Sequence, residues 1–228
     1  APEWLSKAVY GLPEIRRDAI ADATLIASPG CYPTSILLPT LPLLEAGLID
    51  PAQIIADSLS GVSGAGRKTD VSLLYVECNE SLRPYGVPKH RHLSEIEQEL
   101  SLANGAPVTI QFTPHLVPVN RGILTTLYLV PATGQADDFG QWTGAVTDCL
   151  TKRYADESFV RLTGSDRLPD TKNVTGTNTI EIGWAADPRT KRLRVFSAED
   201  NLVKGASGQA VQSFNIRFGF DKTAGLPI

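Results

Sequence analysis

The chain has 228 residues, of which 42% are hydrophobic and 20% charged, and its formal net charge at neutral pH is −4. This composition is typical of a globular protein and excludes general disorder. The acidic balance argues against nucleic acid or an anionic membrane as a partner, and no run approaches the roughly 18 apolar residues of a membrane span. Three cysteines without a C-x-x-C pair favour neither a disulfide framework nor a zinc site, so we expect the reducing setting of the cytoplasm.

The first part of the sequence predicts two helices around a short strand. A helix is expected over residues 14–23 and a buried strand over residues 24–27, T-L-I-A. Residues 34–48 are strongly apolar but contain Pro39 and Pro42. Because a proline inside a helix removes a hydrogen bond and clashes with the preceding turn, we expect this helix to be kinked or broken.

The rest of the sequence predicts a sheet with few helices. Strands are expected where Val, Ile, Thr, Tyr and Phe gather, at residues 53–60, 108–112, 122–130, 179–185 and 193–198. Ser94 and Glu97 match a capping box, which predicts a helix over residues 94–103, and further helices are expected at residues 137–154 and 207–218. Helices that come first and strands that come later favour an α+β fold, with a mixed, largely antiparallel sheet and helices packed on one face.

Cys31 is the first candidate for chemistry. It follows Ser28-Pro29-Gly30 and precedes Pro33, at an expected junction between a strand and a helix. Free amides and the positive end of the helix dipole at such a junction lower a thiol pKa and favour the thiolate. The alternative is a buried cysteine that acts as a small hydrophobe, which is what we expect of Cys78 and Cys149.

Two of the three histidines lie together in the segment Lys89-His90-Arg91-His92. Such a segment is either a solvated basic loop or the source of a general acid/base for Cys31, since imidazole titrates near neutrality. We expect His92 to take that role, with His90 as the second choice. Glu95 follows His92 by three residues and is placed to orient its ring.

Two further features could bind an anion. The segment G-V-S-G-A-G-R-K at residues 61–68 offers Ser63, backbone amides around Gly64 and the guanidinium of Arg67. Arg121 precedes an expected strand and could grip a carboxylate or phosphate with both arms of its guanidinium. A simple glycine turn and a surface arginine are the alternatives. No G-x-G-x-x-G follows a strand and opens a helix, so this sequence carries no dinucleotide-binding fingerprint of its own.

Five motifs in this order resemble those of the N-acetyl-γ-glutamyl-phosphate reductases. They are Ser28-Pro29-Gly30-Cys31-Tyr32-Pro33-Thr34, Ser63-Gly64-Ala65-Gly66-Arg67, His90-Arg91-His92 with Glu95-Ile96, His115-Leu116-Val117-Pro118 with Arg121-Gly122-Ile123-Leu124, and Asn201-Leu202-Val203-Lys204-Gly205-Ala206-Ser207-Gly208-Gln209. The match runs nearly end to end, although the family begins with a nucleotide-binding region that we expect this chain to lack. The first and last motifs are partly shared with aspartate-semialdehyde dehydrogenase and glyceraldehyde-phosphate dehydrogenase.

The resemblance implies a reaction and a set of roles. The reaction is the NADPH-dependent reduction of N-acetyl-γ-glutamyl phosphate to the semialdehyde and phosphate through a thioester on cysteine, a step of arginine biosynthesis. The catalytic residues that it implies are Cys31, His92 and His90. The substrate-binding residues that it implies are Ser63, Gly64, Arg67, Arg121 and Glu95. The residues that it implies for NADP are Asn201, Lys204 and Gly205.

The resemblance also implies an organisation and partners. Residues 1–30 would end a dinucleotide-binding domain, residues 31–204 would form a catalytic and dimerisation domain like that of glyceraldehyde-phosphate dehydrogenase, and residues 205–228 would return to the nucleotide-binding domain. The partners would be a small acyl phosphate, phosphate and further copies of the chain in a dimer or tetramer, in the cytoplasm and without nucleic acid or membrane.

Three other functions stay open at this point. A related reductase would act on an aminoadipyl or aspartyl phosphate and would differ in its side-chain pocket. A thiol hydrolase would use Cys31 and a histidine with water and would need no nicotinamide. A non-catalytic fragment would bind a partner chain without turnover, which the missing dinucleotide fingerprint favours for the isolated chain.

Overall fold

The structure is a computed structural model that describes residues 2–135 and 137–228. The strands are β1 (Ala8–Tyr10), β2 (Leu25–Ala27), β3 (Ile55–Gly61), β4 (Arg83–Pro84), β5 (Gln111–Val117), β6 (Ile123–Leu129), β7 (Val160–Gly164), β8 (Ile180–Asp187) and β9 (Arg192–Glu199). The helices are α1 (Pro2–Leu5), α2 (Pro13–Asp22), α3 (Cys31–Glu45), α4 (Tyr75–Cys78), α5 (Leu93–Asn104), α6 (Phe139–Tyr154) and α7 (Gly208–Arg217). The shorter helical turns are η1 (Val62–Ala65), η2 (Val71–Leu73), η3 (Thr171–Asn173) and the π-helical η4 (Val203–Ser207).

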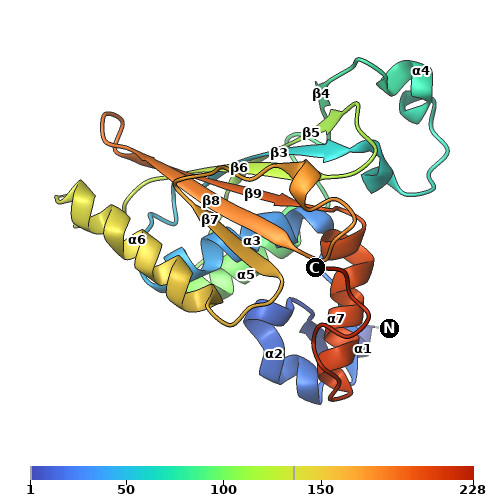
Figure 1. Ribbon diagram of the computed structural model, residues 1–228, viewed down its shortest axis with the longest axis horizontal. Coiled ribbons are helices and arrows are strands. Elements are labelled where there is room, and N and C mark those ends of the chain that lie inside the picture. Colours follow the sequence, from blue (N-terminus) through green and yellow to red (C-terminus); the bar gives the residue numbers. More distant parts are fainter. Residues whose placement is uncertain (1, 136) are drawn as a thin grey trace.

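The larger of two sheets organises the molecule. Its strands lie in the order β4-β5-β3-β6-β9-β8-β7 (Figure 1). The pairs β3–β5 and β7–β8 are parallel, and the other neighbouring pairs are antiparallel. The smaller sheet is the parallel pair β1–β2. The prediction of an α+β fold with a mixed, largely antiparallel sheet is therefore confirmed.

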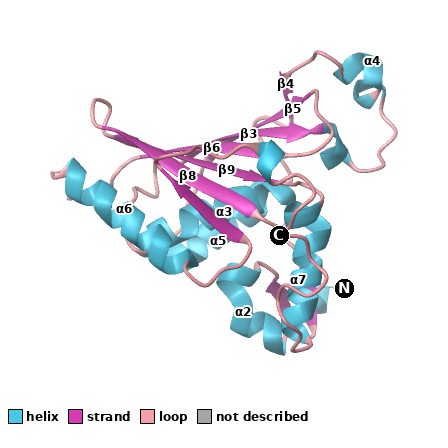
Figure 2. Cartoon of the chain, in the orientation of Figure 1, coloured by secondary structure: helices cyan, strands magenta, loops and turns pink. Residues whose placement is uncertain are grey.

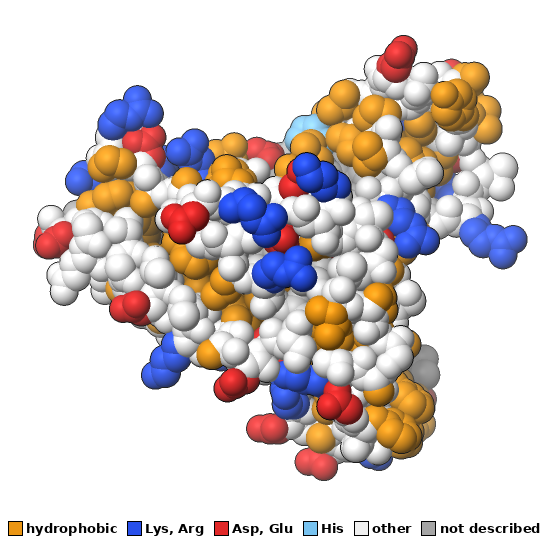
Figure 3. Space-filling model, viewed as in Figure 1, with side chains coloured by type: hydrophobic (Ala, Val, Ile, Leu, Met, Phe, Trp, Pro, Cys, Tyr) orange, Lys and Arg blue, Asp and Glu red, His pale blue; other side chains and the backbone are white. Residues whose placement is uncertain are grey.

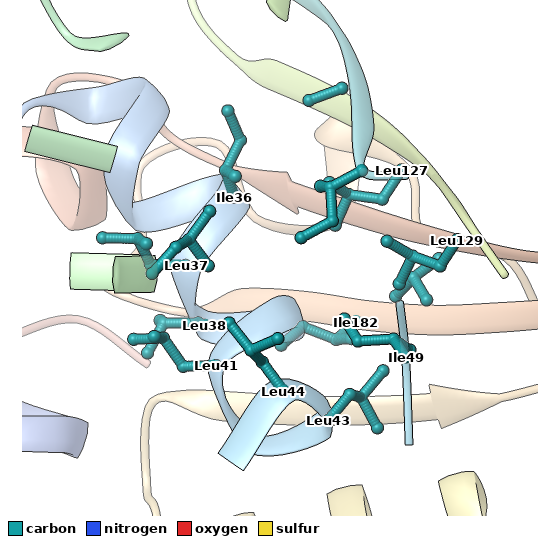
Figure 4. Close-up of a cluster of buried hydrophobic side chains, with 14 of the residues drawn as sticks. Ile36, Leu37, Leu38, Leu41, Leu43, Leu44, Ile49, Leu127, Leu129 and Ile182 are labelled. Carbon is teal, nitrogen blue, oxygen red and sulfur yellow. The ribbon is translucent and has the colours of Figure 1, made fainter. Parts of the chain in front are cut away.

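Helices α3, α5 and α6 pack together on one face of the large sheet (Figure 2). Figure 4 shows part of this core, in which Ile36 of α3 lies on the side of Leu127, whereas Leu37 and Leu41 point to the other side of the helix and Ile182 comes from β8. All of these side chains are 0–1% exposed. Because successive side chains of a strand point to opposite faces, every second residue enters this core. None of the helices in the described ranges is long and apolar enough to cross a membrane.

Helix α3 runs unbroken through Pro39 and Pro42, so the predicted kink or break is wrong. A proline at position 39 leaves the carbonyl of Ser35 without its helical partner, and a proline at position 42 does the same to Leu38. Both carbonyls find replacement donors from other elements. The Ser197 hydroxyl donates to the Ser35 carbonyl at 2.6 Å, and the Tyr154 hydroxyl donates to the Leu38 carbonyl. Tertiary hydrogen bonds therefore compensate for the missing amides.

Two local expectations also need correction. Strand β2 exists, but it is not buried, because it pairs only with β1 and leaves Leu25 38% exposed. Helix α5 is present as predicted, but Ser94 and Glu97 do not form a capping box. The helix begins at Leu93, so the Ser94 hydroxyl donates to the Arg91 carbonyl, and the Glu97 carboxylate accepts from the amide of Ile110.

A long segment, residues 62–92, connects β3 to α5. It projects beyond the large sheet and contains α4 (Figure 1). Figure 3 shows hydrophobic side chains gathered over it. Its exposed apolar residues are Val71, Leu74, Tyr75, Val76, Leu82 and Val87. The segment returns to the sheet through β4, which pairs with β5. This return places the histidine pair near the start of α3.

Candidate active site

Cys31 is the first residue of α3, as the sequence predicts, and Gly30 is the helix cap. The turn before it is held by Glu95 from α5. One carboxylate oxygen of Glu95 accepts hydrogen bonds from the Gly30 amide at 3.2 Å and from the Tyr10 hydroxyl at 3.0 Å. Glu95 therefore fixes the cysteine turn. In the part of the chain that the structure describes, Glu95 makes no hydrogen bond to His92, so it does not orient that ring as the sequence predicts.

The two histidines pack beside this turn. A Cβ on Gly30 would stand 2.6 Å from Nε2 and Cε1 of His92, so only glycine allows the ring to lie against the backbone next to Cys31. The rings of His90 and His92 are 4.8 Å apart between centroids. Nδ1 of His90 accepts a hydrogen bond from the His92 amide at 3.1 Å. Sequence reasoning correctly placed both rings with the cysteine.

Both imidazoles are held in their neutral form. Burial, and then the neighbouring His90 and Arg91, lower the pKa of His92 to about 4. Burial and Arg91 also lower the pKa of His90. A neutral imidazole is able to accept a proton from a thiol. Nδ1 of His92 is buried and has no hydrogen-bond partner among the described residues.

These side chains line a cleft of about 460 Å³ between the projecting segment and the start of α3. Its lining includes Cys31, Tyr32, Gly64, Tyr85, His90 and His92. Tyr32 and Tyr85 join their hydroxyls at 2.7 Å, and the Tyr32 ring meets His90 edge to face. The aromatic wall gives the cleft a fixed shape on the histidine side.

Three cationic side chains that sequence reasoning missed also line the cleft. They are Lys68, Arg83 and Arg91. Lys68 is bound to Asp70 at 2.6 Å, whereas Arg83 donates to backbone carbonyls of Ser72 and Glu77. For two of them the sequence offered a clue. Lys68 follows Arg67, and Arg91 lies between His90 and His92, so both adjoin candidate site residues. The cleft can therefore attract an anion next to the sulfur.

The thiol itself differs from expectation. Burial, and then the nearby Glu199, raise the pKa of Cys31 to about 12, although the amides of Tyr32 and Cys31 act in the opposite direction. The start of the helix was expected to favour the thiolate. The correction has a physical reason: the loss of water around the sulfur outweighs the helix dipole and its amides. Cys31 is thus a thiol that must lose its proton during a reaction.

The residues expected to bind substrate divide into two groups. Gly64 lines the cleft, and its neighbour Ser63 accepts a hydrogen bond from the Asn201 amide at 2.9 Å. Arg67 is exposed and is not among the lining residues. Arg121 lies outside the lining and faces Asp200 at 3.4 Å. The arginines that line the cleft together with Cys31 are Arg83 and Arg91.

The residues expected to bind NADP serve internal contacts. Asn201 is 2% exposed, and both ends of its amide are taken, by the Gly122 amide at 2.8 Å and by Ser63. Lys204 is 0% exposed, and its ammonium lies 2.6 Å from Glu14. Gly205 packs directly on Cys31, because a Cβ there would stand 2.8 Å from the cysteine Cβ. Motif position alone could not reveal that these groups face inward.

Comparisons with known proteins agree with the fold and the motifs. The chain is 59% identical over 222 residues to an N-acetyl-gamma-glutamyl-phosphate reductase of Akkermansia muciniphila, covering 97% of this chain and 62% of that protein. It is 55% identical to the enzyme of the same name from Geobacter metallireducens, covering 99% of this chain and 64% of that protein. The chain thus spans slightly less than two thirds of the length of these curated relatives, and the resemblance drawn from the motifs is confirmed.

Solved structures and a family model place the fold. A crystal structure of aspartate semialdehyde dehydrogenase II from Vibrio cholerae matches with a TM-score of 0.70 at 17% identity, covering 94% of this chain and 69% of that one. At 17% identity this match shows that the two chains share a fold and nothing further. Residues 31–201 match the family model described as the semialdehyde dehydrogenase, dimerisation domain. The chain therefore belongs to the family of semialdehyde dehydrogenase dimerisation domains.

Proposed function

We propose that this chain is the catalytic portion of an NADPH-dependent N-acetyl-γ-glutamyl-phosphate reductase, which forms the semialdehyde in arginine biosynthesis. One observation carries the proposal: Cys31 at the start of α3 shares a cationic cleft with His90 and His92. The names of the relatives at 59% and 55% identity support the same reaction. Neither the related reductase that would act on an aminoadipyl or aspartyl phosphate nor the thiol hydrolase is favoured by a particular contact or by the names of these relatives.

The first chemical step follows from the residues of this chain. The Cys31 sulfur attacks the acyl carbon of the acyl phosphate, the C–S bond forms, and the C–O bond to phosphate breaks. The thiol proton passes to a neutral imidazole, for which we keep His92 as first choice and His90 as second. The product of this step is a thioester, and inorganic phosphate leaves.

The cleft residues assist this step electrostatically. Arg91 and Arg83, with Lys68, would hold the phosphate, because they line the same cleft as the sulfur. The amides of Cys31 and Tyr32 favour a negative charge on the sulfur, because both lower the pKa of the thiol. In a thioester they would lie close to the acyl oxygen and stabilise the negative charge that develops on it.

NADPH is the reductant that this function requires. The residues expected to hold it do not fit the nicotinamide. In the described residues the polar groups of Asn201 and Lys204 are hydrogen-bonded to other parts of this chain. The steps given above are therefore those of this chain's own side chains. Residues 1–30 and 205–228 remain assigned, within the proposal, to the border with a nucleotide-binding domain. The match to a dimerisation domain supports a homo-oligomer, and the cytoplasm is the proposed location.

Acylation without reduction tests the proposal. The full-length protein is mixed with N-acetyl-γ-glutamyl phosphate in the absence of NADPH, and phosphate release is followed together with the protein mass. We expect a burst of about one phosphate per chain and a thioester adduct on Cys31. Cys31→Ala should abolish both, and Cys149→Ser, whose thiol donates to the Pro42 carbonyl, should retain both. An unchanged burst in Cys31→Ala would overturn the proposed function.

A further inference from the structure

Glu199 is a buried carboxyl group for which the proposed reaction has no role so far. It is the last residue of β9. It lies on the same face of the strand as Val195 and Ser197, which point toward α3. Its side chain is 0% exposed, and neither carboxyl oxygen has a hydrogen-bond partner among the described residues. A buried polar group without a partner is costly, so its position calls for an explanation.

The glycine of the π-helical turn brings this carboxyl next to the nucleophile. A Cβ on Gly205 would stand 2.8 Å from Oε1 of Glu199 and 2.8 Å from the Cβ of Cys31. The two side chains therefore approach the same point from β9 and from α3. Because Gly205 has no side chain, η4 does not separate them. The buried carboxyl and the cysteine side chain thus border the same small space over Gly205.

The charged groups around Glu199 do not neutralise it. Lys204 attracts it from η4, but the Lys204 ammonium is bound to Glu14 at 2.6 Å and to Gln212 at 2.9 Å. Asp200, the residue after the end of β9, and Glu14 from α2 repel a negative charge. Burial, only partly opposed by Lys204, raises the pKa of Glu199 well above its usual range. A neutral carboxyl retains a proton that it can donate.

We propose that Glu199 is a positioning residue that shares one negative charge with Cys31, its neutral carboxyl donating a hydrogen bond to the sulfur once the thiol has lost its proton. In this pair a single proton loss gives either a carboxylate beside a thiol or a carboxylic acid beside a thiolate. The second loss is opposed by the repulsion of two buried charges. Glu199 thereby sets how readily the sulfur becomes reactive. The role rests on the proposed function of Cys31 as a nucleophile.

The pair is tested through the alkylation of Cys31, which needs no substrate. In full-length protein that carries Cys78→Ser and Cys149→Ser, the iodoacetamide rate is measured against pH. Glu199→Gln removes the group that can take the negative charge of the pair in place of the sulfur, but it keeps a hydrogen-bond donor. We therefore expect the thiol midpoint to fall by about one unit and the rate at pH 8 to rise about tenfold. Glu199→Leu removes the donor as well, and its midpoint should lie above that of Glu199→Gln.

A matched control and an infrared measurement complete the test. Glu181→Gln removes another fully buried carboxylate, on β8 and on the opposite face of the sheet, where Arg161 and Arg167 pair with it. This variant should leave the alkylation profile unchanged. The infrared band of a neutral carboxylic acid should be present at pH 7, absent in Glu199→Gln, and shifted when Cys31 is alkylated. The pairing would be overturned if the alkylation profiles of Glu199→Gln and the parent were superimposable, or if the carboxylic-acid band were missing. Failure of the acylation burst alone would overturn only the proposed function.

Discussion

His92 shows how one residue position fixes both the shape and the protonation of the cleft. Its ring lies against Gly30 in a space that a Cβ would fill, and it is 7% exposed. Such burial keeps the imidazole neutral, with a pKa of about 4. An unfolded histidine has a pKa of about 6.5. The unfolded chain therefore binds the proton first as the pH falls, which links His92 to stability.

The sign of this link gives a prediction. The stability contributed by neutral His92 is complete above about pH 6.5 and is lost as the pH falls toward 4. We expect the free energy of unfolding of the parent, compared with His92→Gln, to lose roughly 2 kcal/mol between pH 7 and pH 4.5. Denaturant unfolding at a series of pH values measures it. His90→Gln, whose ring is only half-buried, should show the same sign with a smaller amplitude. Parallel curves for His92→Gln and the parent would contradict the burial argument.

At the scale of elements, α3 is held by side chains that belong to other elements. The Tyr154 hydroxyl of α6 serves the Leu38 carbonyl, which Pro42 leaves without an amide partner. Tyr154 is 3% exposed, so water cannot replace this donor. The helix and its neighbour are thus adapted to each other, and the helical continuity depends on the contact.

Removing the donor should be costly only while the proline is present. Tyr154→Phe is expected to lower the free energy of unfolding by about 1–3 kcal/mol, because it leaves a buried carbonyl unpaired. In the background Pro42→Ala the new amide at position 42 can bond the Leu38 carbonyl, so the same substitution should cost less. A double-mutant cycle measured by denaturant unfolding gives the coupling. Equal costs in the two backgrounds would show that the hydroxyl does not replace the missing amide.

The same contacts explain what the sequence could and could not predict about the elements. The helices over residues 14–23, 94–103 and 137–154 and the central strands follow from local pattern, because side-chain periodicity is a local property. The continuity of α3 does not, since its replacement donors Ser197 and Tyr154 come from distant parts of the chain. The start of α5 is also hard to locate from the sequence, because the Ser94 hydroxyl bonds the Arg91 carbonyl and the Glu97 carboxylate accepts from the amide of Ile110.

Sequence motifs predicted which residues come together at the site. They did not predict in which direction each side chain points. The cysteine turn and the histidine pair were correctly brought together from two distant motifs. Lys204 lies in a motif as specific as theirs, yet it points into the interior toward Glu14. Motif position gives the place of a residue along the chain, whereas burial and pairing in the whole molecule decide what its polar group meets.

At the scale of the whole molecule, α3, α5 and α6 cover one face of the large sheet, and no α-helix of residues 2–135 or 137–228 packs over β3 and β6 on the other face. Ser58 and Thr125 join their hydroxyls toward α3 at 2.7 Å. Their neighbours Leu59 and Leu124 are paired in register and half-buried on the opposite face. Apolar side chains in the middle of an open sheet face favour association with another surface. The match of residues 31–201 to a dimerisation domain makes a second copy of this chain the expected partner.

A charge on this face should therefore separate the copies. Leu124→Arg would place an unpaired guanidinium between two closely packed sheets, and such a buried charge is strongly unfavourable. We expect sedimentation equilibrium to show a dimer or tetramer for the parent and a folded monomer for the variant, with circular dichroism confirming the fold. Leu102→Arg, at a leucine that is 62% exposed on α5, serves as the control and should keep the parent's mass. If Leu124→Arg keeps that mass as well, the copies meet through another surface, for which the exposed apolar residues of the projecting segment are the first to be tested.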